Sequence, residues 1–397
     1  MAVGISKIVS ALEPSATLAM AAKARELKAA GKTVYDFSVG EPDFTTPAHI
    51  CEAAQKAMAA GHTHYTASGG IQELRAAIAK QYQATHGLEY SPQQVVVSNG
   101  AKHSLHNAFT VLCDPGDEVI IPAPYWVSYA ELVKLTGAKP VIVPTEEKND
   151  FKLTPAQLRA AITPKTKILL LCSPSNPTGS MYSPDDLGAL ADVVLEKNLV
   201  VMSDEIYERL IYGDNKFASF AAVRPGLAER TITINGVSKA YAMTGWRIGW
   251  TLAPLNVSKA MDSLQSQETS NPCSVSQYAA LAALEGPQQC VSDMLAQFAK
   301  RREYVRERIA ALPDVTCPNM GGAFYAFFNI QKHLDRKYDG VQVDNSAQWC
   351  LELLAQQGVA TVMGSAFGAE GYARLSFATD MKTLEKGFAG IEAFLKS

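Results

Sequence analysis

The sequence predicts an α/β protein in which a large domain, with a mostly parallel sheet between two layers of helices, is joined to a smaller α+β domain. Through the middle of the chain, short β-branched apolar runs alternate with helical patterns, as in βαβ units whose sheet is covered on both faces. After about residue 290 the pattern changes to one long charged helix followed by shorter elements. The 397 residues are 47% hydrophobic and 19% charged, which allows a sizeable core and excludes global disorder.

Six apolar runs are expected to form the sheet of the large domain, which we assign to residues 46–290. Each run lacks interior charge, as strands buried on both faces do. The runs are Val95–Ser98, Glu118–Ile121, Lys139–Val143, Lys167–Cys172, Leu199–Ser203 and Thr231–Ile234. Helices are expected between them, including Lys102–Leu112 and Pro184–Lys197.

The small domain is assigned to residues 291–397. It begins with a long helix, Val291–Leu312, whose Arg301 and Arg302 are expected on a solvated face. The later elements are strands over Gly321–Asn329, Val359–Met363 and Ala373–Phe377 and helices over Ser346–Gln357 and Lys382–Leu395. Residues 1–45, with a helix over Leu18–Ala30, are assigned to an N-terminal arm and part of the small domain. Composition leaves open whether the arm packs there or against a partner chain.

Charge and cysteine content exclude several classes of protein. The formal net charge is −3, from 36 basic and 39 acidic residues, so a nucleic-acid partner is not expected. The apolar stretches are too short to span a bilayer, and charges interrupt any signal-peptide core near the N-terminus. Seven widely spaced cysteines without a C-x-x-C pattern favour a reducing, cytoplasmic location. No metal is expected, because no acidic or cysteine partner completes a ligand set around His62, His64, His103 and His106.

Two polar segments follow apolar runs where ligands bind in such sheets, beyond the carboxyl ends of the strands. Asn99–Lys102 opens a helix with small residues, which lets backbone N–H groups approach an anion. A nearby phosphate or carboxylate would explain Lys102, a cation in a first helical turn, although a solvated lysine is the alternative. Ser173–Gly179 contains two prolines that hold Asn176 in place, either in a site or as a helix cap.

Two further strand ends carry reactive groups. Asp204 directly follows a buried run, where a carboxylate needs a positive partner unless it caps a helix, and Tyr207 could share its site. Lys239 lies in a charge-poor segment, with Arg247 eight residues later. A lysine in an apolar site can have a lowered pKa and act as a Schiff-base nucleophile, whereas a snorkelling surface lysine is the alternative.

Together these motifs resemble the class I pyridoxal-phosphate aminotransferases of fold type I, and most of all the bacterial aspartate aminotransferase branch. The resemblance runs from about residue 14 to the C-terminus. It is carried by Gly40–Phe44, Tyr125–Tyr129, Ser173–Gly179, Ser203–Tyr207, Ser238–Arg247 and Ala373–Ser376.

The resemblance implies catalytic roles for Lys239, Asp204 and Tyr207. Lys239 would form a Schiff base with pyridoxal 5'-phosphate and then act as general base, while Asp204 would keep the pyridine nitrogen protonated. Tyr207 and Asn176 would hold the phenolic oxygen of the ring. The other cofactor contacts would be Trp126 on the ring face, Gly100, Ala101, Lys102, Ser238 and Arg247 around the phosphate, and Tyr65 from the other subunit of a homodimer.

The resemblance also implies the substrates. Arg374 would bind the α-carboxylate, in a site shaped by Gly40 and completed by Trp126 and Asn176. Lys102 would bind the distal carboxylate, so we expect aspartate with 2-oxoglutarate, giving oxaloacetate and glutamate by ping-pong kinetics.

Three alternatives stay open. Some members of the branch convert prephenate to arogenate, or have broader specificity, but this chain has Glu13 where a basic residue is common. A pyridoxal-phosphate lyase would share Lys239 and Asp204. A non-catalytic sensor on this fold would need an added DNA-binding domain, for which residues 1–14 leave no room.

Overall fold

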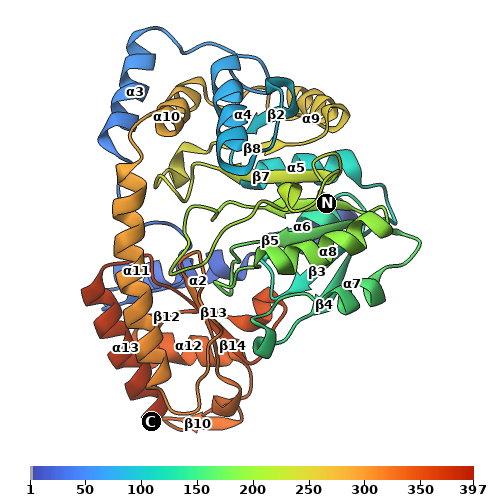
Figure 1. Ribbon diagram of the computed structural model, residues 1–397. Helices are drawn as coiled ribbons and strands as arrows, with labels where there is room; N and C mark the ends of the chain where they lie inside the picture. The colour runs from blue at the N-terminus through green and yellow to red at the C-terminus, as the bar shows by residue number, and fades with distance from the viewer. Residues whose placement is uncertain (1–2) are drawn as a thin grey trace.

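A seven-stranded sheet between two layers of helices forms the larger part of the molecule, as the computed structural model of residues 3–397 shows (Figure 1). The strand order is β2-β8-β7-β6-β5-β3-β4, and only β8 runs antiparallel to its neighbours. The strands are β2 (Val95–Ser98), β3 (Glu118–Ala123), β4 (Lys139–Pro144), β5 (Thr166–Cys172), β6 (Val200–Asp204), β7 (Thr231–Gly236) and β8 (Gly249–Leu252). The mostly parallel α/β fold is therefore confirmed, and the six expected strands all form.

Alternate residues of the central strands face opposite helical layers, which explains their continuous apolar runs, whereas the edge strand β4 is partly exposed. In β5, Ile168 and Leu170 pack in the layer with α5, while Leu169 and Leu171 pack in the layer with α8. The helices around this sheet are α3 (Ala48–Ala59), α4 (Gln72–His86), α5 (Ala101–Leu112), α6 (Ser128–Leu135), α7 (Pro155–Ala161), α8 (Pro184–Glu196), α9 (Leu255–Glu268) and α10 (Ser274–Glu285).

A smaller antiparallel sheet, in the order β13-β14-β9, lies at the end of the molecule where the C-terminus is marked (Figure 1). The strands are β9 (Tyr325–Asn329), β13 (Val362–Met363) and β14 (Tyr372–Ser376), and the helices are α11 (Gln289–Ala310), α12 (Ser346–Gln357) and α13 (Met381–Lys396). A hairpin of β10 (Arg336–Tyr338) and β11 (Val341–Val343) was not expected. Short 3-10 turns are Pro92–Gln94, Glu147–Asn149, Phe220–Ala222, Thr244–Trp246, Gln331–His333 and Gly364–Phe367.

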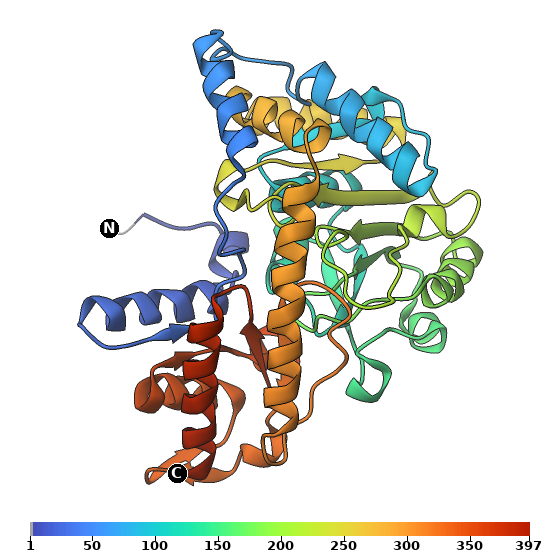
Figure 2. The same cartoon turned by 60° about the vertical axis from the view of Figure 1, so that its left-hand side comes forward.

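The N-terminal segment joins the smaller sheet and its helices. It contains α1 (Lys7–Ser10), α2 (Ala16–Ala29) and β1 (Tyr35–Asp36), and β1 pairs in parallel with β12 (Val359–Ala360). The strand expected over residues 359–363 is thus two strands in two different sheets. Figure 2 shows this segment on the same side of the molecule as α13. The sequence left open whether the N-terminal arm packs with the small domain or against a partner chain, and the structure shows it packed with the small sheet. The domain boundaries at residues 45 and 290 stay a prediction.

The expectation that Arg301 and Arg302 face solvent is wrong. Arg301 is 7% exposed, and its Nη1 and Nη2 donate to Asp43 Oδ1 and Oδ2 at 2.7 and 2.9 Å. Its guanidinium also lies 5.0 Å from the centre of the Phe44 ring. Arg302 donates through Nε to the carbonyl of Met320 at 2.6 Å. The reason is that segments distant in sequence cover α11: Asp43 and Phe44 lie over Arg301, whereas Met320 and Tyr212 contact Arg302.

The helix α11 is the longest, with 22 residues, and carries many charges. Within residues 3–397, no helix has both the length and the apolar character that crossing a bilayer requires.

Replacing Arg301 with alanine is expected to lower the free energy of unfolding by about 3 kcal/mol, because it leaves Asp43 without its bidentate partner in a mostly buried pair. Urea unfolding followed by circular dichroism measures the change. The control is Arg306→Ala on the same helix, where the pair with Glu303 is exposed and should contribute less than about 1 kcal/mol. Equal effects of the two substitutions would contradict the structural role of Arg301.

Candidate active site

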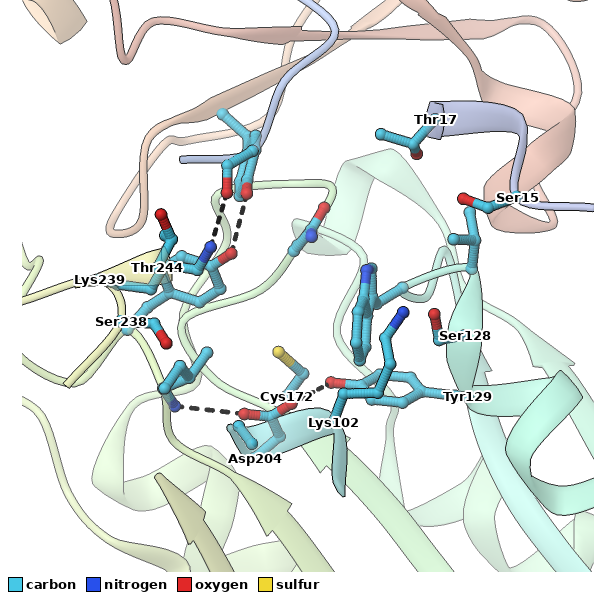
Figure 3. A pocket seen from close by; sticks show the side chains of 18 of the residues that line it. Ser15, Thr17, Lys102, Ser128, Tyr129, Cys172, Asp204, Ser238, Lys239 and Thr244 are labelled. Carbon is cyan, nitrogen blue, oxygen red and sulfur yellow. Dashed lines mark hydrogen bonds between the residues drawn. The ribbon is translucent and has the colours of Figure 1, made fainter. Parts of the chain in front are cut away.

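A cavity of about 250 Å³ lies between the carboxyl ends of the large sheet and the small sheet (Figure 3). Most residues that the sequence assigned to the site line this one cavity. They are Gly40, Ala101, Lys102, Trp126, Asn176, Asp204, Tyr207, Ser238, Lys239, Arg247 and Arg374. Gly100 packs directly behind it, against Arg247. Tyr65 lies elsewhere: it is 90% exposed and lines a separate depression with Ser270 and Asn271.

The N-terminus of α5 and Arg247 form a cradle suited to an anion. Gly100 is the N-cap of α5 with φ 85°, and a Cβ atom there would collide with the Arg247 guanidinium. Arg247 Nη1 donates to the Thr244 carbonyl at 2.8 Å, which fixes the side chain beside Ser238 in the lining. A helix N-terminus and a guanidinium both attract negative charge. This end of the cavity can therefore hold a phosphate.

Lys239 is a partly buried lysine that lines the cavity. Its Nζ donates to the carbonyl of Gly40 at 2.6 Å. Burial lowers the pKa of Lys239 to about 8; the neighbouring Glu41 opposes this, while Arg247 and Arg374 add to it. A lysine with such a pKa is partly neutral near physiological pH, which makes it both a nucleophile and a base. The solvated-lysine alternative is therefore wrong for Lys239.

Asp204 ends β6 as a buried carboxylate, 4% exposed. Its Oδ2 accepts from the Tyr129 hydroxyl at 2.7 Å and its Oδ1 from the Ile206 N–H at 3.2 Å (Figure 3). Burial raises the pKa of Asp204 to about 6, against the two hydrogen bonds and the charge of Lys239. In the described chain, Asp204 is followed directly by turns and not by a helix, so it is not a helix cap. Such a carboxylate can pair with a protonated ring nitrogen.

Arg374 reaches the cavity from β14 in the small sheet. It is 1% exposed, and its Nη1 donates to Asn176 Oδ1 at 3.0 Å and its Nη2 to the carbonyl of Ser38 at 2.6 Å. A guanidinium has five N–H donors in a planar fork. The donors that remain can bind a carboxylate in the cavity, and Asn176 serves here as a positioning group rather than as a helix cap.

A third group of polar side chains lies at the end of the cavity opposite Lys239. Figure 3 shows Lys102 there with Ser15, Thr17 and Ser128. The Lys102 amine lies 4.9 Å from the centre of the Trp126 ring. Burial, followed by the charge of Arg247, lowers the pKa of Lys102. Lys102 is an exposed residue, so the alternative of a solvated lysine stays open, and an anion bound at this end would favour its charge.

Sequence reasoning missed several residues of the cavity. They are Ser15, Thr17, Tyr129, Cys172, Thr244 and Tyr325. Tyr129 ends one of the motifs that carry the resemblance, so its position was a usable signal. Tyr325 sits among apolar residues of β9 and had no signal of its own, because an aromatic residue in a buried strand is ordinary core.

One correction concerns the side chains around His103 and His106. An acidic side chain does lie beside His103 and His106, since Glu268 from α9 is 3.7 Å and 3.2 Å from their Nε2 atoms. Sequence separation hid this contact. Among residues 3–397, no group of three or more histidine, cysteine or acidic side chains has a geometry that could hold a metal ion.

Comparison with known proteins identifies the family. The model of the family "Aminotransferase class I and II" matches residues 32–391. The chain belongs to this family. The chain is 48% identical over 393 residues to an aspartate aminotransferase of Geobacillus stearothermophilus, covering 99% of both chains. It is 46% identical over 392 residues to an aspartate/prephenate aminotransferase of Cereibacter sphaeroides, covering 98% of both.

Solved structures of aminotransferases also share the whole fold. An aspartate aminotransferase from Rhizobium meliloti superimposes with a TM-score of 0.96 at 40% identity, covering 100% of this chain and 99% of that one. One from Thermus thermophilus, solved with maleate, superimposes with a TM-score of 0.91 at 39% identity, covering 99% and 100%. The protein is therefore an aminotransferase, and the cavity described above is its candidate active site.

In the protein without cofactor, we expect the side-chain amine of Lys239 to have an unusually low pKa. Reductive methylation with formaldehyde, quantified by peptide mass spectrometry over a pH series, should give a midpoint near pH 8 for Lys239 because burial disfavours its charged form. Exposed lysines of the same sample are the internal control, since such groups ordinarily titrate near pH ~10.4. A Lys239 midpoint equal to theirs would contradict the desolvated amine.

Proposed function

We propose that this aminotransferase uses pyridoxal 5'-phosphate to transfer the amino group of aspartate to 2-oxoglutarate, giving oxaloacetate and glutamate by a ping-pong reaction. The observation that carries the proposal is the partly buried Lys239, whose amine shares one cavity with the Asp204 carboxylate and the Arg247 cradle. Relatives with the printed name aspartate aminotransferase, 48% and 47% identical over 99% of the chain, support the donor.

The residues present fit this cofactor. The cradle of Gly100, Ala101, Ser238 and Arg247 would hold the phosphate, where a Cβ at position 100 would collide with Arg247. Asp204 would pair with the pyridine nitrogen, Tyr207 and Asn176 would hold the phenolic oxygen, and Trp126 would cover a ring face. When bound, the cofactor supplies an electron sink for the charge left when the substrate loses its α-proton.

The chain's own groups would carry the proton and orient the substrate. Lys239, neutral in part because of its lowered pKa, would take the α-proton and return it one atom away. Arg374 would bind the α-carboxylate with the N–H donors that Asn176 and Ser38 leave free. Asp204, held by Tyr129, would stabilise positive charge on the ring throughout.

The distal carboxylate of the substrate would bind at the end of the cavity with Lys102. Lys102 lines the cavity as an exposed residue and has no carboxylate partner among its described contacts, and Ser15, Thr17 and Ser128 add hydroxyl groups around the same space. The Thermus thermophilus relative was solved with maleate, which is also a dicarboxylate. These observations support a four- or five-carbon dicarboxylic substrate.

Prephenate is the second candidate substrate, because a relative that is 46% identical has the printed name aspartate/prephenate aminotransferase. The recess beside the cavity contains two acidic side chains, Glu13 and Glu131, and the N–H of Glu13 donates to Glu131 Oε2 at 3.0 Å. Lys134 Nζ lies 2.7 Å from Glu131 Oε1 and balances its charge, so the negative charge of Glu13 is what disfavours a second anionic group on a larger substrate. We therefore rank aspartate first, then prephenate or broad specificity, and a lyase or a sensor last.

A cytoplasmic homodimer is part of the proposal. All seven cysteines are free thiols, which supports a reducing compartment. The exposed Tyr65 would reach the phosphate of the neighbouring subunit, and its exposure on this chain agrees with such a role. The division into residues 1–45, 46–290 and 291–397 is kept as the proposed domain arrangement.

The absorption spectrum of the protein purified with pyridoxal 5'-phosphate tests the reaction and the donor together. Aspartate should convert the bound chromophore to its amine form, and 2-oxoglutarate should restore the original band. Restoration by prephenate would show that the second acceptor is also used. Lys239→Ala should abolish the conversion, and a wild-type protein that never acquires the chromophore would refute the proposal.

Replacing Lys102 with alanine should lower kcat/KM for aspartate about 10- to 100-fold, because a charged hydrogen bond to the distal carboxylate contributes ~1.5–3 kcal/mol. The value for alanine, which lacks that carboxylate, should change less than about threefold. Steady-state kinetics with both donors on the same preparation provide the matched control. Unchanged selectivity for aspartate over alanine would remove Lys102 from the substrate site.

A further inference from the structure

Tyr325 on β9 lies where the groups proposed to hold the cofactor meet those proposed to hold the substrate. The side chain is fully buried and lines the cavity. Its hydroxyl is 2.8 Å from the hydroxyl of Tyr207, and its ring centre is 4.7 Å from the Arg374 guanidinium. One residue thus contacts the proposed cofactor ligand Tyr207 and the proposed substrate ligand Arg374.

The contact between the two hydroxyl groups has a defined direction once Tyr207 is engaged. Both phenols are buried, and burial raises the pKa of each, so both keep their protons. A phenol has one hydrogen to donate. If Tyr207 donates its hydrogen to the phenolic oxygen of the cofactor, Tyr325 must donate to Tyr207. Hydrogen bonds in such a chain strengthen one another, so Tyr325 makes Tyr207 a better donor.

The ring of Tyr325 has a separate task. Arg374 is a buried cation, and its described hydrogen bonds are to neutral oxygen atoms of Asn176 and Ser38. The negative faces of aromatic rings stabilise a guanidinium that water does not reach. The rings of Tyr325 and Phe367 lie 4.7 and 5.0 Å from it and supply that stabilisation.

The Tyr325 hydroxyl also lies against the backbone of Gly40. A Cβ atom at position 40 would be 2.6 Å from this oxygen, so Tyr325 and a side chain at position 40 exclude each other. The carbonyl of Gly40 accepts the hydrogen bond from Lys239. Tyr325 therefore also sets how closely the segment that carries Gly40 approaches the Lys239 amine.

We propose that Tyr325 is a positioning residue of this aminotransferase, whose hydroxyl orients Tyr207 toward the cofactor and whose ring holds Arg374 ready for the substrate carboxylate. The two tasks reside in different parts of one side chain, so two substitutions separate them. The proposal rests on the proposed function, because it assumes that Tyr207 serves the cofactor and Arg374 the substrate.

The first variant, Tyr325→Phe, removes only the hydroxyl. A hydrogen bond to the anionic form of an oxygen lowers its pKa, so weaker donation by Tyr207 should raise the pH midpoint of the bound cofactor's absorption band by about 0.5. The shift should be smaller than that of Tyr207→Phe. The dissociation constant for maleate should stay within about twofold, because the ring beside Arg374 remains. A midpoint equal to that of the wild type would overturn the role of the hydroxyl.

The second variant, Tyr325→Leu, also removes the ring. The dissociation constant for maleate and the KM for aspartate should rise about tenfold above those of Tyr325→Phe, which corresponds to the loss of a desolvated cation–π contact. Values equal to those of Tyr325→Phe would overturn the role of the ring. If the leucine variant does not fold, the phenylalanine variant still tests the hydroxyl, and an unshifted pH midpoint overturns the proposal.

Tyr338→Phe is the matched control. Tyr338 is a buried tyrosine in the same C-terminal part of the chain. Its hydroxyl donates to the carbonyl of His333 at 2.9 Å, away from the cavity. Its loss should leave the pH midpoint unchanged, so an equal shift would mean that only general destabilisation is measured and would overturn the proposal. A wild-type protein without the chromophore refutes the proposed function, whereas a normal wild type with an unshifted Tyr325→Phe refutes the positioning role alone.

Discussion

The concentration of positive charges around one cavity is the constraint on which this site depends. Arg374 is buried, Lys239 is partly buried, and the exposed residues Lys102 and Arg247 line the same cavity, while the buried Asp204 supplies a carboxylate among them. Desolvated cations are costly unless anions or hydrogen bonds compensate for them. The aromatic rings around Arg374 and the backbone carbonyls of Gly40 and Ser38 provide part of that compensation, whereas the helix N-terminus at Gly100 adds to the positive potential. The remainder calls for ligands that carry a phosphate and carboxylates.

The constraint also explains why two sheets are needed. The large sheet brings Asp204 and Lys239 to one edge by the ends of β6 and β7. The small sheet places Arg374 opposite them, and the N-terminal segment covers the cavity with Gly40. Neither sheet alone encloses the cavity, so the exclusion of water depends on how the small sheet and the N-terminal segment pack against the large one.

Much of this arrangement follows from local sequence. The six apolar runs predict six strands of the large sheet, and the polar residues after them predict Asp204, Lys239 and the cradle, because the carboxyl ends of parallel strands share an edge. The same reasoning does not predict β8, because this strand follows the Lys239–Arg247 segment without an intervening α-helix. It inserts antiparallel between β2 and β7. Local sequence also does not predict the contacts of Arg301 and Tyr325, because their partners Asp43 and Tyr207 are distant in the chain. A helical period of buried positions in α11, from Phe298 through Arg301 to Val305, was nevertheless available as a signal.

The length of α11 has a mechanical consequence. Its 22 residues make a rod of about 33 Å that begins beside the large sheet and ends beside the small one. Arg301 ties the chain at Asp43 to the middle of this rod, and β1 ties the same chain segment to β12. These two ties join the segment that carries Gly40 both to the middle of α11 and to the strand beside the small sheet, so that Gly40 and Arg374 are held in one packed unit.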